Sequence, residues 1–585
     1  MPVSLNDMRF LIHDVLDYEQ HYQSLGLNDP PNRELLDAII DEAVRFTETE
    51  LAPLNESGDV QGCRIVDGQV ITPDGFKEAY ELFVRGGWAG LSGDPVYGGQ
   101  GLPDSVSLIL EELMCSANMA WSMYPGLSRG VISALESHGS DEQKQIFLTK
   151  LLSGEWTGTM CLTEAQAGSD VGLAKTKASP TADGSYAITG TKIFISAGDH
   201  DMAKNILHLV LARLPDAPAG TKGISMFVVP KINLDGSLNG VSCGGIEKKM
   251  GIHGNATCVL NFDNATGYLI GEPNEGMRYM FTMMNGARVV VGLQGVCLAE
   301  AAYLKSADYA ADREQMRSLS GPKAPDRPAD PILVHPDVRR MLLVQKTIVE
   351  GGRALVYYTG QLADKVAAFQ GEEQARAEEL LDFLTPIVKG VLTELGFESV
   401  NHAMQIFGGY GFIRETGVEQ YVRDARITMI YEGTTQIQAL DLLGRKVLLT
   451  QGTGLMAFIG EINDLVEAIR KPLPDISAKL EEAAREWAAL TLPLGNKAQE
   501  NLDELGAAAV DYLFYSGYVA LAYCWARIAQ TAAQGDENDQ YLAGKLATAR
   551  FYFARILPRT MAHKAAMEAG ADVLMSISDE ALTSD

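Results

Sequence analysis

A single carboxylate stands in an apolar segment of the chain. The stretch ITMIYEGTTQIQ runs from Ile427 to Gln438, and Glu432 is its only acid. An apolar setting raises the pKa of a carboxylic acid, which suits it to act as a base near neutral pH. Gly433 follows directly and permits a sharp turn, and Thr434 and Thr435 are candidate N-caps for the next helix. Taken alone, Glu432 is most simply a loop acid before a helix.

A second segment, MCLTEAQAGSDVGLAKTKA, combines the end of a strand with a small polar loop. A β segment ends at Thr163, and Gly168, Ser169 and Asp170 follow in a tight loop. Such a loop exposes backbone N–H groups and a small hydroxyl, which suits binding of a flat heterocycle or a phosphate. An ordinary Gly-Ser-Asp turn would have the same sequence.

Two further segments have compatible chemistry. In GTKIFISAG, Phe194 and Ser196 are two residues apart, so we expect both side chains on one face of a strand. An aromatic ring and a hydroxyl on one face suit the edge of a flavin, and an ordinary core strand is the alternative. In QIFGGYGF, which begins at Gln405, three glycines allow another group to approach the backbone closely.

Composition excludes several other classes of function. The 48 basic and 76 acidic residues give a net charge of −28, which disfavours nucleic acid and anionic membranes as partners. The seven cysteines are odd in number and include no CxxC pair, as in proteins of a reducing compartment. No HExxH motif or carboxylate cluster predicts a metal site. We expect a cytoplasmic protein, because the N-terminal residues lack the pattern of a secretory signal.

The elements that must position these residues change in type along the chain. Apolar residues at helical spacing predict an N-terminal helical domain over 1–156. Short β-rich segments separated by turns predict an antiparallel sheet or small barrel over 157–275. A helical bundle with the candidate base follows over 276–448, interrupted by a proline-rich insert, and a C-terminal helical extension occupies 449–585. The fold class is therefore multidomain α+β.

The longest uncharged apolar stretch belongs to the extension. It runs from Tyr512 to Ala526, and its 15 residues are fewer than the roughly 20 that a spanning helix needs. We therefore expect a buried bundle helix and no transmembrane segment.

Taken together and in order, CLTEAQAGSD, QIFGGYGF and IYEGTTQIQ resemble the acyl-CoA dehydrogenase family over roughly residues 35–445. The length and the C-terminal extension resemble a subgroup containing bacterial long-chain acyl-CoA dehydrogenases and 3-methylmercaptopropionyl-CoA dehydrogenases. The resemblance implies FAD as cofactor, no metal, and an acyl-CoA as substrate. It also implies an electron-transfer flavoprotein as electron acceptor, a homodimer and a role in fatty acid β-oxidation.

The resemblance also implies individual roles. Glu432 matches the catalytic base, and the position where some relatives carry that base is Ala287 here, which leaves Glu432 as the sole candidate. Ser169, Arg288, Tyr431 and Gly433 are assigned to the substrate. The residues assigned to FAD are Met160, Leu162, Thr163, Gly168, Ser169, Phe194, Ser196, Arg313, Gln405, Gly409, Thr434 and Gln436. Phe194 and Ser196 depart from the usual Trp and Thr, and Met316 replaces the aromatic residue that usually follows the Arg313 position.

The implied reaction is α,β-dehydrogenation of an acyl-CoA thioester to the trans-2-enoyl-CoA. The substrate is a fatty acyl-CoA or 3-methylthiopropanoyl-CoA, and the sequence does not distinguish them. An acyl-CoA oxidase would share the chemistry and pass electrons to oxygen. A non-catalytic flavin-binding relative associated with nucleic acid would need a basic C-terminal block, whereas residues 445–585 carry 13 basic and 19 acidic residues.

Overall fold

The computed structural model describes residues 3–583, which form two compact units. The first unit comprises residues 36–287, and the second comprises residues 3–35 together with 288–583. The division at residue 36 falls inside the range predicted for the N-terminal helical domain. The second division falls inside one long helix, α10 (Gly276–Asp312), which contributes its first turns to one unit and its remainder to the other.

The first unit joins a set of helices to a β-sheet. Its helices are α3 (Arg33–Phe46), α4 (Pro53–Gln61), α5 (Phe76–Arg85), α6 (Asp104–Ala117), α7 (Met119–His138), α8 (Asp141–Gln143) and α9 (Thr149–Leu152). Ser140 caps the N-terminus of α8 in a capping box with Gln143. A two-stranded ribbon, β1 (Arg64–Val66) with β2 (Gln69–Ile71), lies between α4 and α5 in the chain.

The sheet of the first unit has seven strands. They are β3 (Trp156–Cys161), β4 (Lys177–Pro180), β5 (Tyr186–Ser196), β6 (Asn205–Arg213), β7 (Ile224–Pro230), β8 (Val241–Ile246) and β9 (Thr257–Ile270). The hydrogen-bonded order is β3-β6-β4-β5-β9-β7, β8 pairs with β9, and a further pairing of β6 with β7 closes a ring of five strands. The predicted barrel is therefore present, but it is mixed rather than purely antiparallel, because β6 runs parallel to β3 and β4.

Close contacts fix α7 against this sheet. Gly158 of β3 donates its backbone N–H to Ser128 Oγ at 2.9 Å, and a Cβ at Gly158 would lie 2.5 Å from Val131. Glycine is therefore required where the strand crosses the helix. The Tyr124 hydroxyl donates to the Gly254 carbonyl at 3.1 Å and accepts from the Ala256 N–H at 3.0 Å. These contacts place β3, and the loop after it, on a rigid base.

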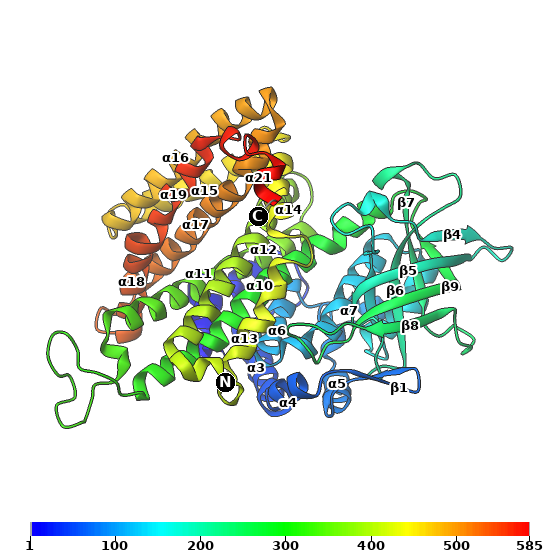
Figure 1. Cartoon of the computed structure of the whole chain (residues 1–585), viewed down its shortest axis with the longest axis horizontal. Coiled ribbons are helices and arrows are strands. Elements are labelled where there is room, and N and C mark those ends of the chain that lie inside the picture. The colour runs from blue at the N-terminus through cyan, green and yellow to red at the C-terminus, as the bar shows by residue number, and fades with distance from the viewer. Residues whose placement is uncertain (1–2, 584–585) are drawn as a thin grey trace. The chain divides into compact units, whose positions relative to one another are not determined.

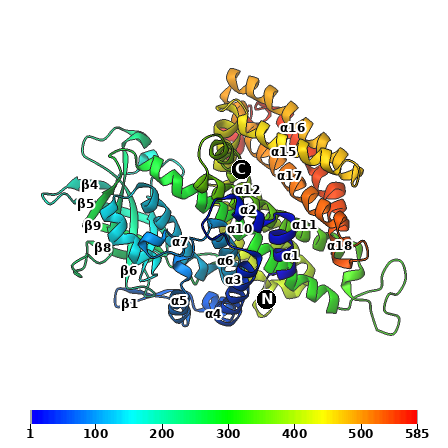
Figure 2. The same cartoon turned by 180° about the vertical axis from the view of Figure 1, so that it is seen from behind.

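The second unit is helical, and two of its long helices, α11 (Pro336–Ala368) and α12 (Glu372–Phe407), pack along each other (Figure 1). Its helices are α1 (Leu5–Phe10), α2 (Tyr18–Ser24), the end of α10, α11 (Pro336–Ala368), α12 (Glu372–Phe407), α13 (Val418–Ala425), α14 (Thr435–Leu440), α15 (Thr453–Ile469), α16 (Pro474–Glu500), α17 (Leu502–Gln534), α18 (Gln540–Phe551), α19 (Thr560–Ala569), α20 (Asp572–Met575) and α21 (Asp579–Thr583). Figure 2 shows α1 and α2 beside α10 and α11. The proline-rich insert forms a long loop between α10 and α11 that reaches away from the bundle (Figures 1 and 2).

The C-terminal extension packs on the bundle through α17. This helix contacts α11, α12 and α14, and the apolar stretch Tyr512–Ala526 is its buried centre. Two described helices, α10 and α17, are long and apolar enough to span a membrane, and 78% and 67% of their apolar windows are buried inside the protein. Such burial is also found in core helices of soluble proteins.

Candidate active site

Glu432 lies in a tight turn of the second unit, between a 3-10 turn (Arg426–Met429) and α14. Both Glu432 and Gly433 have positive φ, at 54° and 93°. The left-handed region is unfavourable for a residue with a Cβ and is common at functional sites. The Thr434 side chain accepts a hydrogen bond from the Ile437 N–H at 3.4 Å and caps α14, which confirms the predicted cap. The turn therefore holds the carboxylate in a strained, defined position.

The sequence predicts that the chain turns sharply at Gly433. The structure shows in addition that the Gln438 side chain packs against this glycine and donates to the turn. A Cβ at Gly433 would lie 2.6 Å from Gln438 Nε2 and 3.2 Å from Ile437. The Gln438 amide donates to the Glu432 carbonyl at 3.1 Å and to the Gly433 carbonyl at 3.3 Å. A larger residue at position 433 would therefore displace the Gln438 amide from the turn and would adopt a strained positive φ.

The environment of Glu432 favours its neutral form. The Glu432 Oε2 atom is enclosed and has no hydrogen-bond partner among the described residues. Burial raises the pKa of Glu432 above the usual value, while the positive charges of Arg288 and Lys389 oppose that rise. The result is a carboxylate whose basicity is higher than that of an exposed glutamate.

Arg288 and Tyr431, both assigned to the substrate, have protein partners here. Arg288 is buried and forms an ion pair with Asp441 at 2.7 Å. The Tyr431 hydroxyl donates to Gln294 Oε1 on α10. The structure therefore brings Arg288, Tyr431, Glu432 and Gly433 into one site, with Asp441 and Gln294 fixing two of the side chains.

Lys389 is the functional residue that sequence reasoning missed. It lies in the middle of α12, is fully buried, and donates a hydrogen bond to the Gly433 carbonyl. Burial lowers the pKa of Lys389 to about 8 despite the opposing negative charge of Glu432. A lysine in the otherwise apolar run LTPIVKGVL was the available signal.

The predicted flavin loop lies on the first unit, directly after β3. Thr163 accepts a hydrogen bond from the Ile193 N–H at 2.9 Å, which joins the loop to β5 beside Phe194. The buried Glu164 and Lys192 pair at 2.9 Å, and Glu164 also accepts from the Lys175 and Thr176 N–H groups. Burial would raise the pKa of Glu164, but Lys192 and these hydrogen bonds lower it to about 2. A permanently charged anchor therefore holds the loop.

The structure brings the other assignments on the first unit onto the same strands and loop. Met160 and Leu162 are half-buried on and just after β3, and they pack against the core shared with α7. Gly168 and Ser169 are exposed in the loop, where the Asp170 side chain accepts from the Gly172 N–H at 3.1 Å. The loop thus presents exposed backbone, as expected for contact with a cofactor.

Strand alternation predicted that Phe194 and Ser196 share one face, but the strand is not regular between them and the start of β5. A register shift interrupts the pairing of β5 with β9 between Lys192 and Ile195. Phe194 within this bulge has a φ of 58° and is 60% exposed, whereas Ser196 is half-buried. Bulges redirect side chains and occur next to active sites. The position of Phe194 is thus set by the bulge.

A groove on the second unit gathers two residues assigned to the dinucleotide. It has a volume of about 440 Å³ and is lined by Tyr309, Arg313, Gln315, Ile332, Ile406, Phe407, Gly408, Gly409, Tyr410 and Ile413. The Arg313 guanidinium lies 5.8 Å from the centre of the Tyr410 ring. Gln405 is exposed one turn before the groove, and its carbonyl accepts the Gly408 N–H. Thr434 and Gln436, which are also assigned to FAD, lie at the start of α14, and Gln436 is exposed there.

Models of acyl-CoA dehydrogenase domains match almost the whole chain. The N-terminal domain matches residues 34–155, the middle domain 159–265 and the C-terminal domain 274–448, and a domain described as acetyl-CoA dehydrogenase C-terminal like matches 458–578. The protein is a member of the acyl-CoA dehydrogenase family.

Individual relatives cover the full length. The chain is 43% identical to 3-methylmercaptopropionyl-CoA dehydrogenase of Ruegeria pomeroyi, over 96% of this chain and 95% of that protein. It is 34% identical to a butyryl-CoA dehydrogenase of Syntrophomonas wolfei, over 98% of each. A solved acyl-CoA dehydrogenase from Bacillus anthracis, complexed with FAD, shares the fold with a TM-score of 0.76 at 22% identity, over 94% of this chain and 90% of that one.

Family membership implies FAD, and the described residues fit such a cofactor on each unit. On the first unit, the exposed Gly168–Ser169 backbone and the exposed Phe194 ring lie on segments joined by a hydrogen bond. On the second unit, the groove offers the Arg313 guanidinium beside Gly408 and Gly409, where added Cβ atoms would meet nothing within 4 Å. Open backbone and a guanidinium suit a diphosphate and a heterocycle.

Proposed function

We propose that this acyl-CoA dehydrogenase oxidises 3-methylthiopropanoyl-CoA or a short linear fatty acyl-CoA, with Glu432 as the base that removes the α-proton. The carrying observation is the strained turn that holds Glu432 with one carboxylate oxygen enclosed and unpartnered among the described residues. The 43% identity to a 3-methylmercaptopropionyl-CoA dehydrogenase over 96% of the chain supports the methylthio substrate. The butyryl-CoA dehydrogenase relative supports the linear alternative.

The residues of the chain account for the proton transfer. A thioester α-proton is weakly acidic, so its removal needs a base of raised pKa and stabilisation of the developing enolate oxygen. Burial gives Glu432 the raised pKa. The Gly433 turn allows the Glu432 carboxylate and its backbone N–H to face the same ligand, so that one residue supplies both the base and a donor. Bound FAD supplies the acceptor for the hydride that leaves the β-carbon.

The physiological electron acceptor, assembly and compartment are part of the same proposal. We expect electrons to pass to an electron-transfer flavoprotein, and the enzyme to be a cytoplasmic homodimer. The resemblance of Arg313, Gln405 and Gly409 to residues that contact the cofactor across a dimer interface supports the dimer. The odd number of cysteines and the lack of a CxxC pair in the sequence support the compartment.

The test is anaerobic bleaching of the flavin absorbance by a series of acyl-CoA thioesters. The series should contain 3-methylthiopropanoyl-CoA, butyryl-CoA and longer linear chains, with a CoA ester lacking a β-hydrogen as the control. We expect rapid bleaching by one of the first two, slow reoxidation in air, and fast reoxidation by an electron-transfer flavoprotein. Rapid reoxidation by oxygen would instead indicate an oxidase, and no bleaching by any thioester would contradict the proposal.

A further inference from the structure

Lys389 is connected to the catalytic turn from behind. Its side chain is fully buried in α12, and its ammonium group donates to the Gly433 carbonyl. No carboxylate of the described residues lies within ion-pair distance of Lys389; the acids that influence it through space are Glu432 and Glu394. Glu394 is engaged elsewhere, because it accepts a hydrogen bond from Thr435 Oγ1 at 2.6 Å.

The hydrogen bond from Lys389 acts where the backbone is strained. Glu432 and Gly433 have consecutive positive φ angles, a region that is unfavourable for a non-glycine residue such as Glu432. Such a conformation persists only where its surroundings enforce it. Two donors do so here, since Lys389 and the Gln438 amide both donate to the Gly433 carbonyl, and Gln438 also holds the Glu432 carbonyl.

Lys389 also differs from the other cation near the base. Arg288 is paired at 2.7 Å with Asp441, which also pairs with Arg445, so its charge is partly compensated. The charge of Lys389 has no such partner, and it therefore acts on Glu432 through a buried, weakly screening medium. A buried lysine with an uncompensated charge is unfavourable for folding, which suggests retention for function.

The extension fixes the position of Lys389. A Cβ at Gly390 would lie 2.6 Å from Leu513 of α17, and a Cβ at Gly517 of α17 would lie 2.4 Å from Val391. The backbones of α12 and α17 therefore approach closely at Gly390 and Val391, the two residues that follow Lys389. This contact holds the α12 backbone at Lys389 against α17, which fixes the point from which the lysine side chain reaches the turn.

We propose that Lys389 is a positioning residue for Glu432: its ammonium group holds the Gly433 carbonyl in the left-handed turn, and its charge stabilises the carboxylate form of the base. This inference rests on the proposed function, because it assumes that Glu432 removes the α-proton. It assigns to Lys389 no contact with substrate or cofactor.

The test compares Lys389→Met, which removes the charge and the donor, with Lys389→Gln, which removes only the charge. Lys471→Met, at an exposed lysine between α15 and α16, is the control for loss of one positive charge. The readout is the rate of α-hydrogen exchange from the acyl-CoA in D2O, measured by NMR between pH 5 and 9. This exchange reports the base without needing an electron acceptor.

We expect both Lys389 variants to move the acidic limb of the exchange profile to higher pH, because removal of a nearby positive charge raises the pKa of Glu432 further. On the plateau at high pH, Lys389→Gln should approach the parent rate, while Lys389→Met should remain lower by about tenfold or more because the turn is no longer held. Lys471→Met should match the parent throughout. Unchanged profiles in both Lys389 variants would overturn the inference.

Two further measurements separate positioning from a general structural role. Lys389→Met should melt at or above the parent temperature, since it removes an uncompensated buried charge. Hydrogen–deuterium exchange of peptides covering 427–438, measured without substrate, should be faster in Lys389→Met than in Lys389→Gln. A lower melting temperature with an unshifted pH profile would show a structural role only. Full exchange activity in Glu432→Gln would instead refute the proposed function itself.

Discussion

At the scale of single residues, the site depends on charges that are buried without full compensation. Glu432 has an enclosed, unpartnered oxygen, and Lys389 behind it has no carboxylate partner among the described residues. Burial raises the pKa of Glu432 and lowers the pKa of Lys389, so it favours the neutral form of each group. Each group therefore stabilises the charged form of the other across the turn, and a change in one is expected to alter the titration of the other.

Glu432→Gln tests the base directly. The amide is nearly isosteric but cannot accept a proton, so we expect loss of α-hydrogen exchange by at least about 10³-fold with FAD still bound. In the parent, activity should fall as pH decreases through the raised pKa of Glu432, because the base acts only when ionised. NMR exchange and the flavin spectrum check both statements. Near-normal dehydrogenation by the variant would contradict the assignment.

Glu111 offers a separate prediction about stability. It is buried on α6, neither carboxylate oxygen has a hydrogen-bond partner among the described residues, and burial raises its pKa from 4.5 to about 7. Between these pH values the folded state holds the proton that the unfolded state releases, so stability falls as pH rises. The full cost above pH 7 is about 3 kcal/mol.

Glu111→Gln should therefore stabilise the protein at pH 8 by up to about 3 kcal/mol and have little effect at pH 4.5. Thermal melts at both pH values measure the difference. The exposed Glu78 of α5 provides the control, since Glu78→Gln should change the melting temperature little at either pH. A decrease in stability for Glu111→Gln at pH 8 would show that Glu111 has a favourable partner as a carboxylate.

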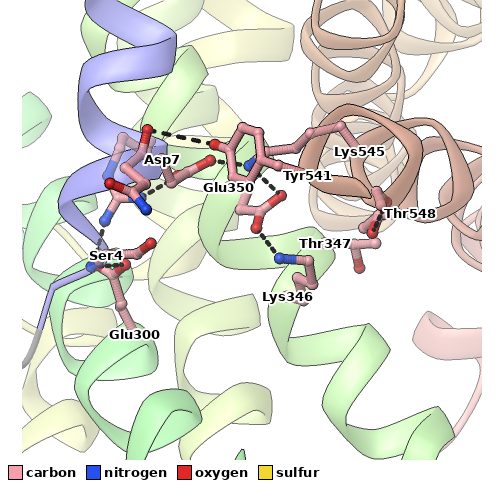
Figure 3. Close-up of polar contacts among 12 residues, drawn as sticks. Ser4, Asp7, Glu300, Lys346, Thr347, Glu350, Tyr541, Lys545 and Thr548 are labelled. Carbon is pink, nitrogen blue, oxygen red and sulfur yellow. Dashed lines mark hydrogen bonds and ion pairs between the residues drawn. The ribbon is translucent and has the colours of Figure 1, made fainter. Parts of the chain in front are cut away.

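At the scale of elements, the N-terminal segment is fastened into the second unit by buried charges (Figure 3). Asp7 of α1 contacts Arg353 of α11 and Lys545 of α18, while Arg353 also contacts Glu300 of α10. Lys545 lies 3.0 Å from Glu350, which also contacts Lys346. The three acids and three bases balance, and together they link the start of the chain to the C-terminal extension.

Asp7→Asn should loosen this connection. Burial opposes ionisation of Asp7, but Lys545 and Arg353 outweigh it and hold the pKa of Asp7 below its usual value. Because removal of one partner leaves a buried positive charge uncompensated, we expect a cost of about 3–5 kcal/mol. The native contact should also weaken as pH falls below the normal aspartate pKa, where protonation begins.

Limited proteolysis at neutral pH measures the effect on the segment. Asp7→Asn should release the first 30 residues or so faster than the parent, with a lower melting temperature. Asp14→Asn is the control, because Asp14 is half-exposed and lies 3.9 Å from Arg33; exposed pairs contribute little. Equal protease resistance in the two variants would show that the network does not hold the segment.

At the scale of the whole molecule, exposed apolar side chains stand in the segments that contribute to the groove around Arg313. Tyr410 lines the groove and is 53% exposed, and Phe412 and Met316, next in sequence to the lining residues Ile413 and Gln315, are 79% and 72% exposed. Exposed apolar clusters of this kind mark interaction surfaces. This is the surface that the homodimer proposal requires, since Arg313 and Gly409, two of the three residues predicted to contact the cofactor across subunits, line the groove.

Phe412→Asp should therefore favour the monomer. We expect light scattering after gel filtration to give about 63.2 kDa for the variant and twice that mass for the parent, with less flavin retained by the variant. Leu492→Asp, at an exposed position 72% accessible on α16, is the matched control and should remain dimeric. A monomeric parent that retains FAD would contradict the homodimer.

The sequence by itself determined the type and order of the elements and singled out Glu432 as the candidate base. Helical and strand periodicities are local properties, so they predicted the helix–sheet–helix–helix order, and the buried stretch at Tyr512–Ala526 followed from its length. Glu432 was recognisable because a lone acid in an apolar segment is costly, and motifs in order along the chain carry a family resemblance.

Only the tertiary structure decided how the base is held. Lys389 and Gln438 reach the turn from residues up to 44 positions away in sequence, and no local pattern encodes which carbonyl a distant donor contacts. The bulge at Phe194 likewise depends on register with β9, which strand alternation within one segment cannot reveal. Chemistry that depends on residue type was therefore predictable, whereas positions set by long-range packing and pairing were not.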